Sequence, residues 1–393
     1  MKCNITQTTL GELSVGRRGY YGLGAPAVPY SPSLYTYLRI TDINDDGTLN
    51  MSDLKSVSAD NASDYLLKIN DIVFARTGAS TGRNYFYDGT DGDFVFAGFL
   101  IKFSLDPSKV NPRYVKYYCQ SKEYRDWIAA FNTGSTRGNI NTKTLASMPI
   151  RLPDMETQHR IVNILDALEN KRKNNKQIND NLQQQAFALF EQLLLTADDG
   201  ECSVADIAHL NPKRALAKNQ EAKCIEMSQL STSGAFPSGW EKRPFNGGMR
   251  FSNGDTLLAR ITPCLENGKA AFIDFLDTSE VAFGSTEYIV LAPKGEIPPE
   301  FLYCLARYPV FSDYAVKNMN GSSGRQRVSA ETIGQFKLPR PSTNELKRFG
   351  NVVSSLFLKM RFNSLENMRL SSLRDSLLPK LMSGELDVSE LDI

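Results

Sequence analysis

The sequence predicts an α+β protein in which two similar domains alternate with two long helices. The segments 152–196 and 338–383 each have an unbroken helical period, and they match each other position by position. The segments that precede them share one order of short strands, turns and helices. We therefore expect a domain over 1–151, a helix over 152–196, a second domain over 197–337, a second helix over 338–383 and a C-terminal tail over 384–393.

The first helix has apolar residues at every seventh position, which is typical of a coiled coil. Pro153 and Asp154 precede it, as at the start of a helix. From Thr157 onward it would span about 50 Å at 1.5 Å per residue. The row that we expect to pair with another helix is Ile161, Leu168, Asn175, Leu182 and Leu189.

The second helix repeats this row. At a constant offset, Arg160, Asn163 and Lys171 also have identical counterparts in Arg348, Asn351 and Lys359. A lone asparagine recurs in the middle of both rows, which indicates an internal repeat rather than two unrelated amphipathic helices. The second row is Phe349, Leu356, Asn363, Leu370 and Leu377.

Composition restricts the chemistry. The chain has 393 residues, of which 41% are hydrophobic, and its 45 Lys and Arg are balanced by 44 Asp and Glu. A globular protein is expected, and any charged partner must be bound by local patches. Six cysteines without a C-x-x-C pair and only two histidines predict reduced core cysteines and no metal site. No long apolar run or leader pattern is present, so we expect a cytoplasmic protein.

The first domain contains short alternating runs that predict strands at Tyr37–Ile43, Asp71–Arg76 and Phe94–Phe103. Segment Pro112–Phe131 predicts a pair of helices on the sheet. The domain is therefore expected to be α+β.

The second domain repeats that order. Cys224–Leu230 matches the first predicted strand and Gly254–Arg260 matches the second. Pro299-Glu300-Phe301 corresponds to Pro112-Arg113-Tyr114, which begins the predicted helix pair of the first domain. A weak similarity of Gly200-Glu201 to Gly384-Glu385 indicates a circular arrangement.

No catalytic residue is predicted. Phosphate-loop, dinucleotide-loop and methyltransferase motifs are absent from the sequence. Pro153-Asp154 with Glu169-Asn170-Lys171 matches a metal-nuclease pattern formally, but these carboxylates lie too far apart along one helix to share a cation. We interpret Asp154 as a helix cap and Glu169 as a residue on a solvated face.

Repeated loops that combine arginine with Gly, Ser and Thr indicate nucleic-acid binding. Arginine can read guanine, Asn and Gln can read adenine, and small hydroxyl side chains can hold phosphates. Such loops are often plain surface turns, but here they recur at the same place in both halves. The proposed DNA-binding residues are Arg17, Arg18, Tyr20, Arg76, Thr77, Ser80, Arg83, Ser135, Thr136, Arg137, Asn139, Lys242, Arg243, Arg260, Ser322, Ser323, Arg325, Gln326 and Arg327.

On these features the chain resembles the specificity subunit of type I restriction-modification systems, over essentially its whole length. The resemblance is carried by the helix openings, Leu152-Pro153 with Gln158-x-x-Ile161 and Leu338-Pro339 with Glu345-x-x-x-Phe349, and by the turns Ala75–Ser80 and Thr133–Arg137. The second copy departs from it at Pro263-Cys264 and lacks the glutamine at its helix opening.

The resemblance implies two target recognition domains, each reading one half of a split DNA sequence, and helices that pair as an antiparallel coiled coil in a pseudo-two-fold arrangement. It also implies that methyltransferase subunits, two of them, dock on the helices and that restriction subunits join the complex. Adenine methylation and DNA cleavage, with S-adenosylmethionine, ATP and magnesium, would belong to those partner subunits.

In such a pairing Asn175 and Asn363 should face each other near the axis and hold the register, since a slipped pairing would leave each amide without a partner. The alternative is that the seam is rotated and both side chains are solvated.

Two other functions stay open at this point. The chain could be a scaffold that joins two proteins through its helices without binding DNA. A fused restriction-methylation enzyme is a third possibility, which the missing catalytic motifs disfavour.

Overall fold

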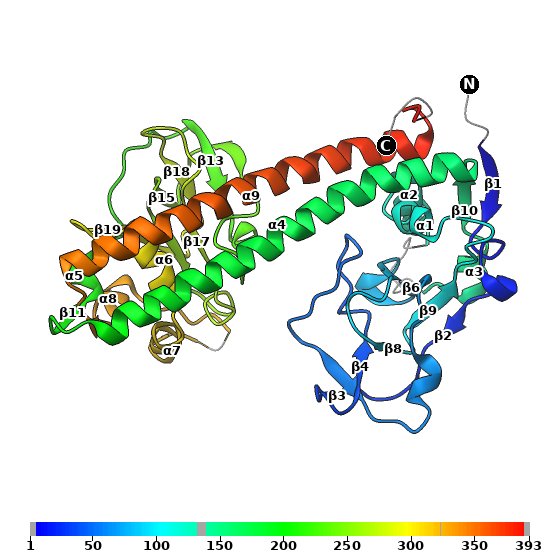
Figure 1. Ribbon diagram of the computed structural model, residues 1–393, viewed down its shortest axis with the longest axis horizontal. Coiled ribbons are helices and arrows are strands. Elements are labelled where there is room, and N and C mark those ends of the chain that lie inside the picture. Colours follow the sequence, from blue (N-terminus) through cyan, green and yellow to red (C-terminus); the bar gives the residue numbers. More distant parts are fainter. Residues whose placement is uncertain (1–4, 132–138, 323, 389–393) are drawn as a thin grey trace. The chain divides into compact units, whose positions relative to one another are not determined.

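The computed structural model describes residues 5–131, 139–322 and 324–388. The chain forms two compact units, Met1–Glu169 with Ser372–Ile393 and Asn170–Ser371. Both limits fall inside the two long helices, α4 (Met155–Thr196) and α9 (Thr343–Ser383), which are present as predicted (Figure 1). Each unit therefore contains one head, meaning the strands and short helices before α4 or before α9, together with part of each long helix.

The first head is built from two four-stranded sheets and one two-stranded sheet. The first has the order β2-β9-β6-β7, the second has the order β3-β5-β4-β8, and β1 pairs with β10. Its strands are β1 (Thr6–Thr9), β2 (Tyr20–Tyr21), β3 (Val28–Pro29), β4 (Tyr35–Leu38), β5 (Lys55–Val57), β6 (Asp71–Ala75), β7 (Asn84–Tyr87), β8 (Phe94–Phe96), β9 (Leu100–Ser104) and β10 (Pro149–Leu152). Its helices are η1 (Val15–Arg17), η2 (Ala62–Tyr65), η3 (Gly78–Ser80), α1 (Pro112–Tyr118), α2 (Lys122–Ala129) and α3 (Thr142–Ala146).

The second head repeats this plan. Its sheets have the orders β12-β19-β16-β17 and β14-β13-β18-β15, and β11 pairs with β20. In both heads one sheet contains a single parallel pair, β4 with β8 and β13 with β18. Its strands are β11 (Glu201–Ser203), β12 (Ala208–Leu210), β13 (Glu221–Ile225), β14 (Glu241–Pro244), β15 (Met249–Phe251), β16 (Thr256–Ala259), β17 (Ala270–Phe272), β18 (Ala282–Gly284), β19 (Tyr288–Pro293) and β20 (Lys337–Pro339). Its helices are α5 (Val204–Ile207), η4 (Met227–Gln229), α6 (Pro299–Arg307), α7 (Pro309–Lys317) and α8 (Ala330–Gly334).

Strand β6 is the centre of the first head because both of its faces are buried. Successive side chains of a strand point to opposite faces. Ile72 and Phe74 pack on the side of α1, whereas Val73 and Ala75 pack into the core shared with the other sheet. This explains why the run DIVFA is continuously apolar after its first residue.

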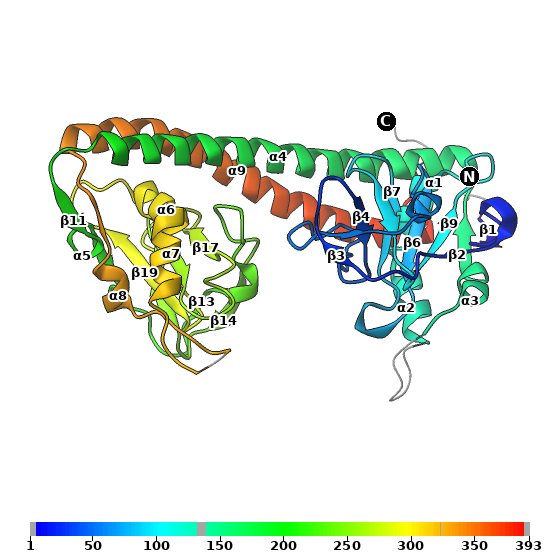
Figure 2. The same ribbon diagram turned by 90° about the horizontal axis from the view of Figure 1, so that it is seen from below.

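Each head is packed onto both long helices. In the first unit, Ile161 and Leu165 of α4 and Leu381 of α9 share a core with Tyr114 of α1. In the second unit, α6 lies between strand β19 and the long helices (Figure 2). The register of α4 against α9 thus sets which side chains reach the head cores.

Polar contacts also attach α1 to α4. Tyr117 donates a hydrogen bond to Asp166 at 2.5 Å, and Lys116 forms an ion pair with Glu169 at 2.5 Å. Burial raises the pKa of the Tyr117 hydroxyl well above its usual value. Asp154 accepts a hydrogen bond from the Thr157 amide at 2.9 Å, so it caps α4 as predicted. The prediction of a solvated face at Glu169 was wrong, because this carboxylate binds the head.

Three predicted strands differ from the structure. The run Cys224–Leu230 leaves the sheet after Ile225 and continues as the short helix η4. The run Tyr37–Ile43 leaves the sheet after Leu38, because Asp42 accepts hydrogen bonds from the backbone and the guanidinium of Arg39 and closes a turn. The run Phe94–Phe103 is broken by a turn, in which the Leu100 amide donates to the Ala97 carbonyl at 2.8 Å. The helix pair predicted over Pro112–Phe131 is confirmed as α1 and α2.

The two asparagines of the heptad rows are buried, as predicted, but their partners differ from the prediction. Asn175 donates to Asn367 at 3.0 Å and Asn363 donates to Asn179 at 2.8 Å. Asn179 and Asn367 are themselves equivalent positions of the repeat. Helices α4 and α9 are therefore antiparallel in the second unit. The pseudo-two-fold axis of this contact passes between the two asparagine pairs and not through a direct contact of Asn175 with Asn363.

The same symmetry extends to the backbone. Asn179 donates to the Met360 carbonyl at 3.2 Å, and Asn367 donates to the Arg172 carbonyl at 3.4 Å. Met360 and Arg172 are also equivalent positions. One contact breaks the symmetry, since Asn175 also donates to Glu366 at 2.7 Å and the equivalent of Glu366 is Ile178, which is 41% exposed.

The predicted pairing rows differ in burial. Ile161, Asn175, Phe349 and Asn363 are buried. The other positions of both rows are half-buried: Leu168, Leu182, Leu189, Leu356, Leu370 and Leu377.

The circular arrangement is visible where the first unit closes. In the second unit, residues 197–200 lead directly from α4 into β11. In the first unit, Gly384 follows α9 and lies beside Ile5, which precedes β1; a Cβ added at Gly384 would be 3.0 Å from the Ile5 side chain. Gly200 and Gly384 both have left-handed backbones, with φ of 87° and 73°. This confirms the similarity that the sequence showed between the two positions.

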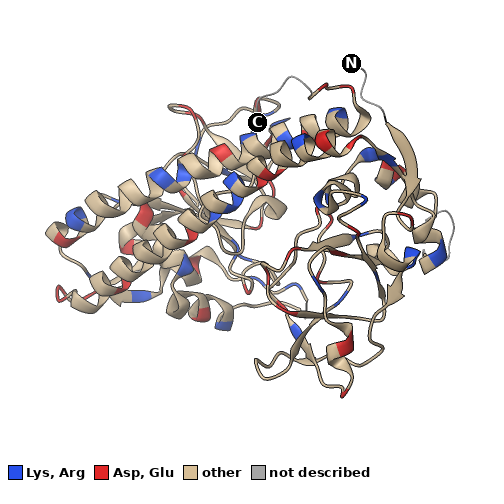
Figure 3. Ribbon diagram, turned by 45° about the vertical axis from the view of Figure 1, so that its right-hand side comes forward, with Lys and Arg blue, Asp and Glu red and all other residues tan. Residues whose placement is uncertain are grey.

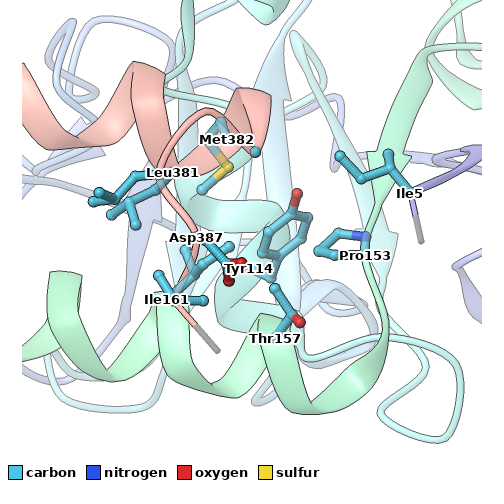
Figure 4. Close-up of a pocket in the computed structure, with 11 residues that line it drawn as sticks. Ile5, Tyr114, Pro153, Thr157, Ile161, Leu381, Met382 and Asp387 are labelled. Atoms are coloured by element: carbon cyan, nitrogen blue, oxygen red, sulfur yellow. The ribbon is translucent and has the colours of Figure 1, made fainter. Parts of the chain in front are cut away.

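A pocket of about 510 Å³ lies at this closure (Figure 4). Its walls are apolar side chains from the residue before β1, the start of α4 and the end of α9, including Ile5, Ile161 and Leu381, with Tyr114 and Asp387. A second pocket of about 570 Å³, lined by Phe301, Pro341 and Leu346, occupies the equivalent place in the second unit. The two pockets therefore belong to the repeated junction between a head and its helix.

The glutamine that the second copy lacks has a structural role in the first. Gln158 is buried, accepts a hydrogen bond from the Asn111 amide at 2.9 Å and donates to the Pro153 carbonyl at 2.8 Å. Leu346 takes its place in the second unit and packs into the core. There the helix start is capped by Ser342 and Glu345 instead.

Four of the described cysteines are free and buried, as predicted for core residues, whereas Cys264 is free but only half-buried. Among the helices described, none has the length and apolarity needed to cross a membrane.

We predict that Asn363 and Asn179 are energetically coupled. Asn363→Ala leaves the side-chain oxygen of Asn179, Oδ1, without its hydrogen-bond donor. The variant should therefore lower the free energy of unfolding by about 1–3 kcal/mol. The double variant with Asn179→Ala should cost less than the sum of the single variants. Urea titrations of the four proteins measure this. Asn351→Ala, an exposed position of α9, is the control and should change stability by less than about 0.5 kcal/mol. Additive losses would contradict the pairing.

Candidate nucleic-acid interface

Arg76 and Arg260 occupy the same position in the backbone of the two heads. The Arg76 amide donates to the Phe99 carbonyl at 3.1 Å, and the Arg76 carbonyl accepts from the Ile140 amide at 2.9 Å. In the second head, the Arg260 amide donates to the Glu287 carbonyl at 3.0 Å, and its carbonyl accepts from the Val328 amide at 2.9 Å. Each arginine is thus held at the end of a central strand, between two loops.

The loop after Arg76 is closed by its own hydrogen bonds. Thr81 donates through its hydroxyl to the Gly78 carbonyl at 2.7 Å, and Gly78 has a φ of 74° with open space around its Cα. A side chain there would be strained by the backbone and not by a neighbour. The Gly82 amide donates back to Ala75 at 2.9 Å, so the loop returns to the strand that it left.

In the first head, two arginines lie over exposed tyrosines. The Arg76 guanidinium is 4.8 Å from the Tyr21 ring centroid, and Arg18 is 4.9 Å from that of Tyr20. Arg18 also donates to the Tyr20 hydroxyl at 3.0 Å. Tyr20 is 41% exposed and Tyr21 is 43% exposed. Stacked guanidiniums next to exposed rings can contact both phosphates and bases.

In the second head, the arginine is held by a carboxylate. Arg327 donates to Glu287 through Nη2 at 2.7 Å and through Nε at 2.9 Å, and Arg260 Nε lies 3.4 Å from the same carboxylate. Hydrogen bonds from Arg327 lower the pKa of Glu287, so its charge is present at neutral pH. The cluster has two positive groups and one negative group.

Some proposed DNA-binding residues make contacts within the protein. Arg83 forms an ion pair with Asp45 at 2.7 Å and donates to the Ile43 carbonyl at 3.2 Å. Arg243, on strand β14, forms ion pairs with Glu241 at 2.6 Å and Glu226 at 2.9 Å. Binding an anion would require these guanidiniums to exchange one partner for another.

The remaining proposed residues are divided between buried and exposed positions. Ser80 is buried, Thr77 and Gln326 are half-buried, and Thr77 is bridged to Asn139 across the two loops. The exposed ones are Arg17, Lys242, Asn139, Ser322 and Arg325. Ser135, Thr136, Arg137 and Ser323 lie outside the described residues.

Sequence reasoning noted Tyr21 in the basic-aromatic segment 17–21 but missed two residues at these positions, Phe99 and Glu287. Phe99 is 58% exposed beside Arg76, and Glu287 takes its place beside Arg260. These residues are more than twenty positions away from their arginines along the chain. Strand pairing brings them together, and neither spacing nor a local motif could have identified them.

Charge along the long helices is mixed. Figure 3 shows Lys and Arg interspersed with Asp and Glu along both helices. Several of these charges are paired between helix positions, such as Lys176 with Asp180 at 2.7 Å and Lys171 with Glu366 at 3.3 Å. The helices present no continuous basic stripe, so the arginine loops of the heads are the better candidates for a nucleic-acid interface.

The chain is also similar to known proteins. Residues 30–184 match the family model described as a type I restriction modification DNA specificity domain. The chain is 24% identical over 406 residues to the type I restriction enzyme HindI specificity subunit of Haemophilus influenzae, which covers 81% of this chain and 87% of that protein. It is 32% identical over 173 residues to the EcoAI specificity subunit of Escherichia coli, which covers 42% of this chain and 29% of that one.

One solved structure shows that the fold is shared along the chain. The S subunit of a type I restriction-modification system from M. genitalium aligns with a TM-score of 0.58 at 19% identity, over 97% of this chain and 96% of that one.

We predict that Arg76 and Arg260 bind DNA. If an arginine reads a base, its replacement by alanine should cost about 1–3 kcal/mol of binding and relax one target position; if it holds a phosphate, all sequences should weaken alike. Gel-shift titrations with target and mutated duplexes distinguish these outcomes. Arg151→Ala, an exposed arginine on β10, is the matched control. Unchanged binding by both variants would remove these residues from the interface.

Proposed function

Since the chain belongs to the specificity-subunit family of type I restriction-modification systems, we propose that it binds a DNA target of two half-sites, one read by each head. The observation that carries this proposal is the repeated frame of Arg76 and Arg260. The two loops have the same backbone arrangement but carry different side chains. One scaffold could therefore contact two different base sequences.

In this proposal the chain directs catalysis without performing it. The relatives are specificity subunits, and two methyltransferase subunits and the restriction subunits would supply adenine methylation and cleavage. S-adenosylmethionine, ATP and magnesium would bind to those partners. The long helices would carry the methyltransferase subunits, and the complex would act in the cytoplasm, where the genome is.

A salt titration tests DNA binding directly. A protein that neutralises several phosphates loses affinity steeply as salt is raised, with a log-log slope of about −0.9 per phosphate contact. We expect such a slope for a duplex that carries the methylated target, and a much lower affinity for unrelated duplexes. Mapping methylated adenines in the source genome identifies the target. A chain that acts as a scaffold without DNA affinity would show no binding at any salt concentration, and the proposal would then fail.

A second prediction concerns the independence of the heads. Each head has its own core and packs on its own portion of the long helices. Replacing residues 1–151 with the first domain of another specificity subunit should therefore change one half of the methylated sequence and leave the other half intact. Sequencing the methylated sites reports both halves at once. A change in both halves, with the protein folded, would show that the heads read DNA jointly.

A further inference from the structure

Phe99 and Glu287 are equivalent residues of opposite chemistry. Each supplies the carbonyl that accepts the amide hydrogen of the head arginine, and each lies in the turn before the strand that pairs with that arginine's strand, β9 or β19. The backbone position is thus shared by both heads. Only the side chain differs.

In the second head the Glu287 side chain limits what the arginines can bind. Arg327 uses Nε and Nη2 on this carboxylate, and its Nη1 donates to the Arg325 carbonyl at 3.1 Å. A guanidinium has five N–H donors, so few remain for a ligand. Arg260 lies against the same carboxylate at 3.4 Å. The carboxylate therefore holds both guanidiniums in place and halves their net charge.

In the first head no described carboxylate is within ion-pair distance of Arg76. Its guanidinium stacks on Tyr21, and its Nε is buried without a hydrogen-bond partner in the described part of the chain. Among the residues that the structure describes, the Nη groups of Arg76 form no hydrogen bond. Phe99, whose backbone carbonyl accepts the Arg76 amide hydrogen, has a side chain that is 58% exposed. A guanidinium without a described carboxylate partner, stacked on the exposed Tyr21 ring, can donate to a base edge, and the exposed Phe99 ring can pack on an apolar base surface.

We propose that this shared position, Phe99 in the first head and Glu287 in the second, determines which half-site each head accepts. The inference rests on the proposed function. In the first head Arg76 donates to an acceptor edge of the DNA while Phe99 packs on an adjoining base. In the second head Glu287 is a positioning residue, which orients Arg260 and Arg327 and offers its own oxygens only to a base that donates, such as cytosine.

The test changes the side chain at position 99 or 287 in the full chain, which is co-expressed with its methyltransferase subunits. Phe99→Glu should place a carboxylate beside Arg76, as in the second head, and neutralise it. Binding of the wild-type target should fall by about 5- to 150-fold, which is the range for one good contact between a side chain and a base. The altered methylation should be confined to the first half-site. Ile69→Glu is the matched control: it adds the same charge at an exposed apolar side chain of the first head, at the opposite end of β6 from Arg76, and should leave the methylated sequence unchanged.

The reciprocal variant probes the second head. Glu287→Gln keeps a hydrogen-bonding side chain of the same size but removes the charge, so it should relax one position of the second half-site and leave the first half unchanged. Sequencing of methylated adenines provides the readout. A general loss of structure would affect both halves, which circular dichroism and the unchanged half-site distinguish from a local effect.

Two results would separate the possible failures. If the wild-type chain binds no DNA, the proposed function itself fails. If the wild-type chain binds its target and both Phe99→Glu and Glu287→Gln methylate the same sequences with the same affinity, the proposed function stands and this inference is overturned.

Discussion

The antiparallel contact between α4 and α9 is the constraint on which the rest of the structure depends. Two asparagine pairs, Asn175 with Asn367 and Asn363 with Asn179, form together in one register only, and one member of each pair is buried. A slip of one turn would bring only two of the four asparagines together and leave the other two without an asparagine partner, at a cost of about 1–3 kcal/mol for each buried polar group left unpaired. Because both heads take core residues from both helices, this register also decides how each head is completed.

The internal repeat gives two heads with one backbone design and different chemistry. The frame that holds Arg76 between Phe99 and Ile140 is repeated around Arg260, hydrogen bond for hydrogen bond. Main-chain hydrogen bonds depend little on side-chain identity, so the frame can be kept while the side chains around it change. This separation of frame from surface would let the two heads read different half-sites, as in the proposed function.

Long-range features of the sequence predicted the architecture well. A helical period sustained over some forty residues has few alternatives, and the recurrence of a mid-row asparagine identified the repeat. Strand limits were predicted less well, because the turn at Asp42 and the break between Phe96 and Leu100 depend on side-chain and backbone hydrogen bonds that alternation of apolar residues does not reveal.

The sequence by itself determined the order of domains and helices, the location of the arginine loops, and the presence of a polar position within each seam. These are properties of local spacing and composition. Only the tertiary structure decided that Asn175 binds Asn367 and not Asn363, that Arg260 is held by Glu287, and that Arg76 stacks on Tyr21. Each of these contacts joins residues far apart in the chain, and their partners follow from strand pairing and helix register, which fix distances that no local pattern encodes.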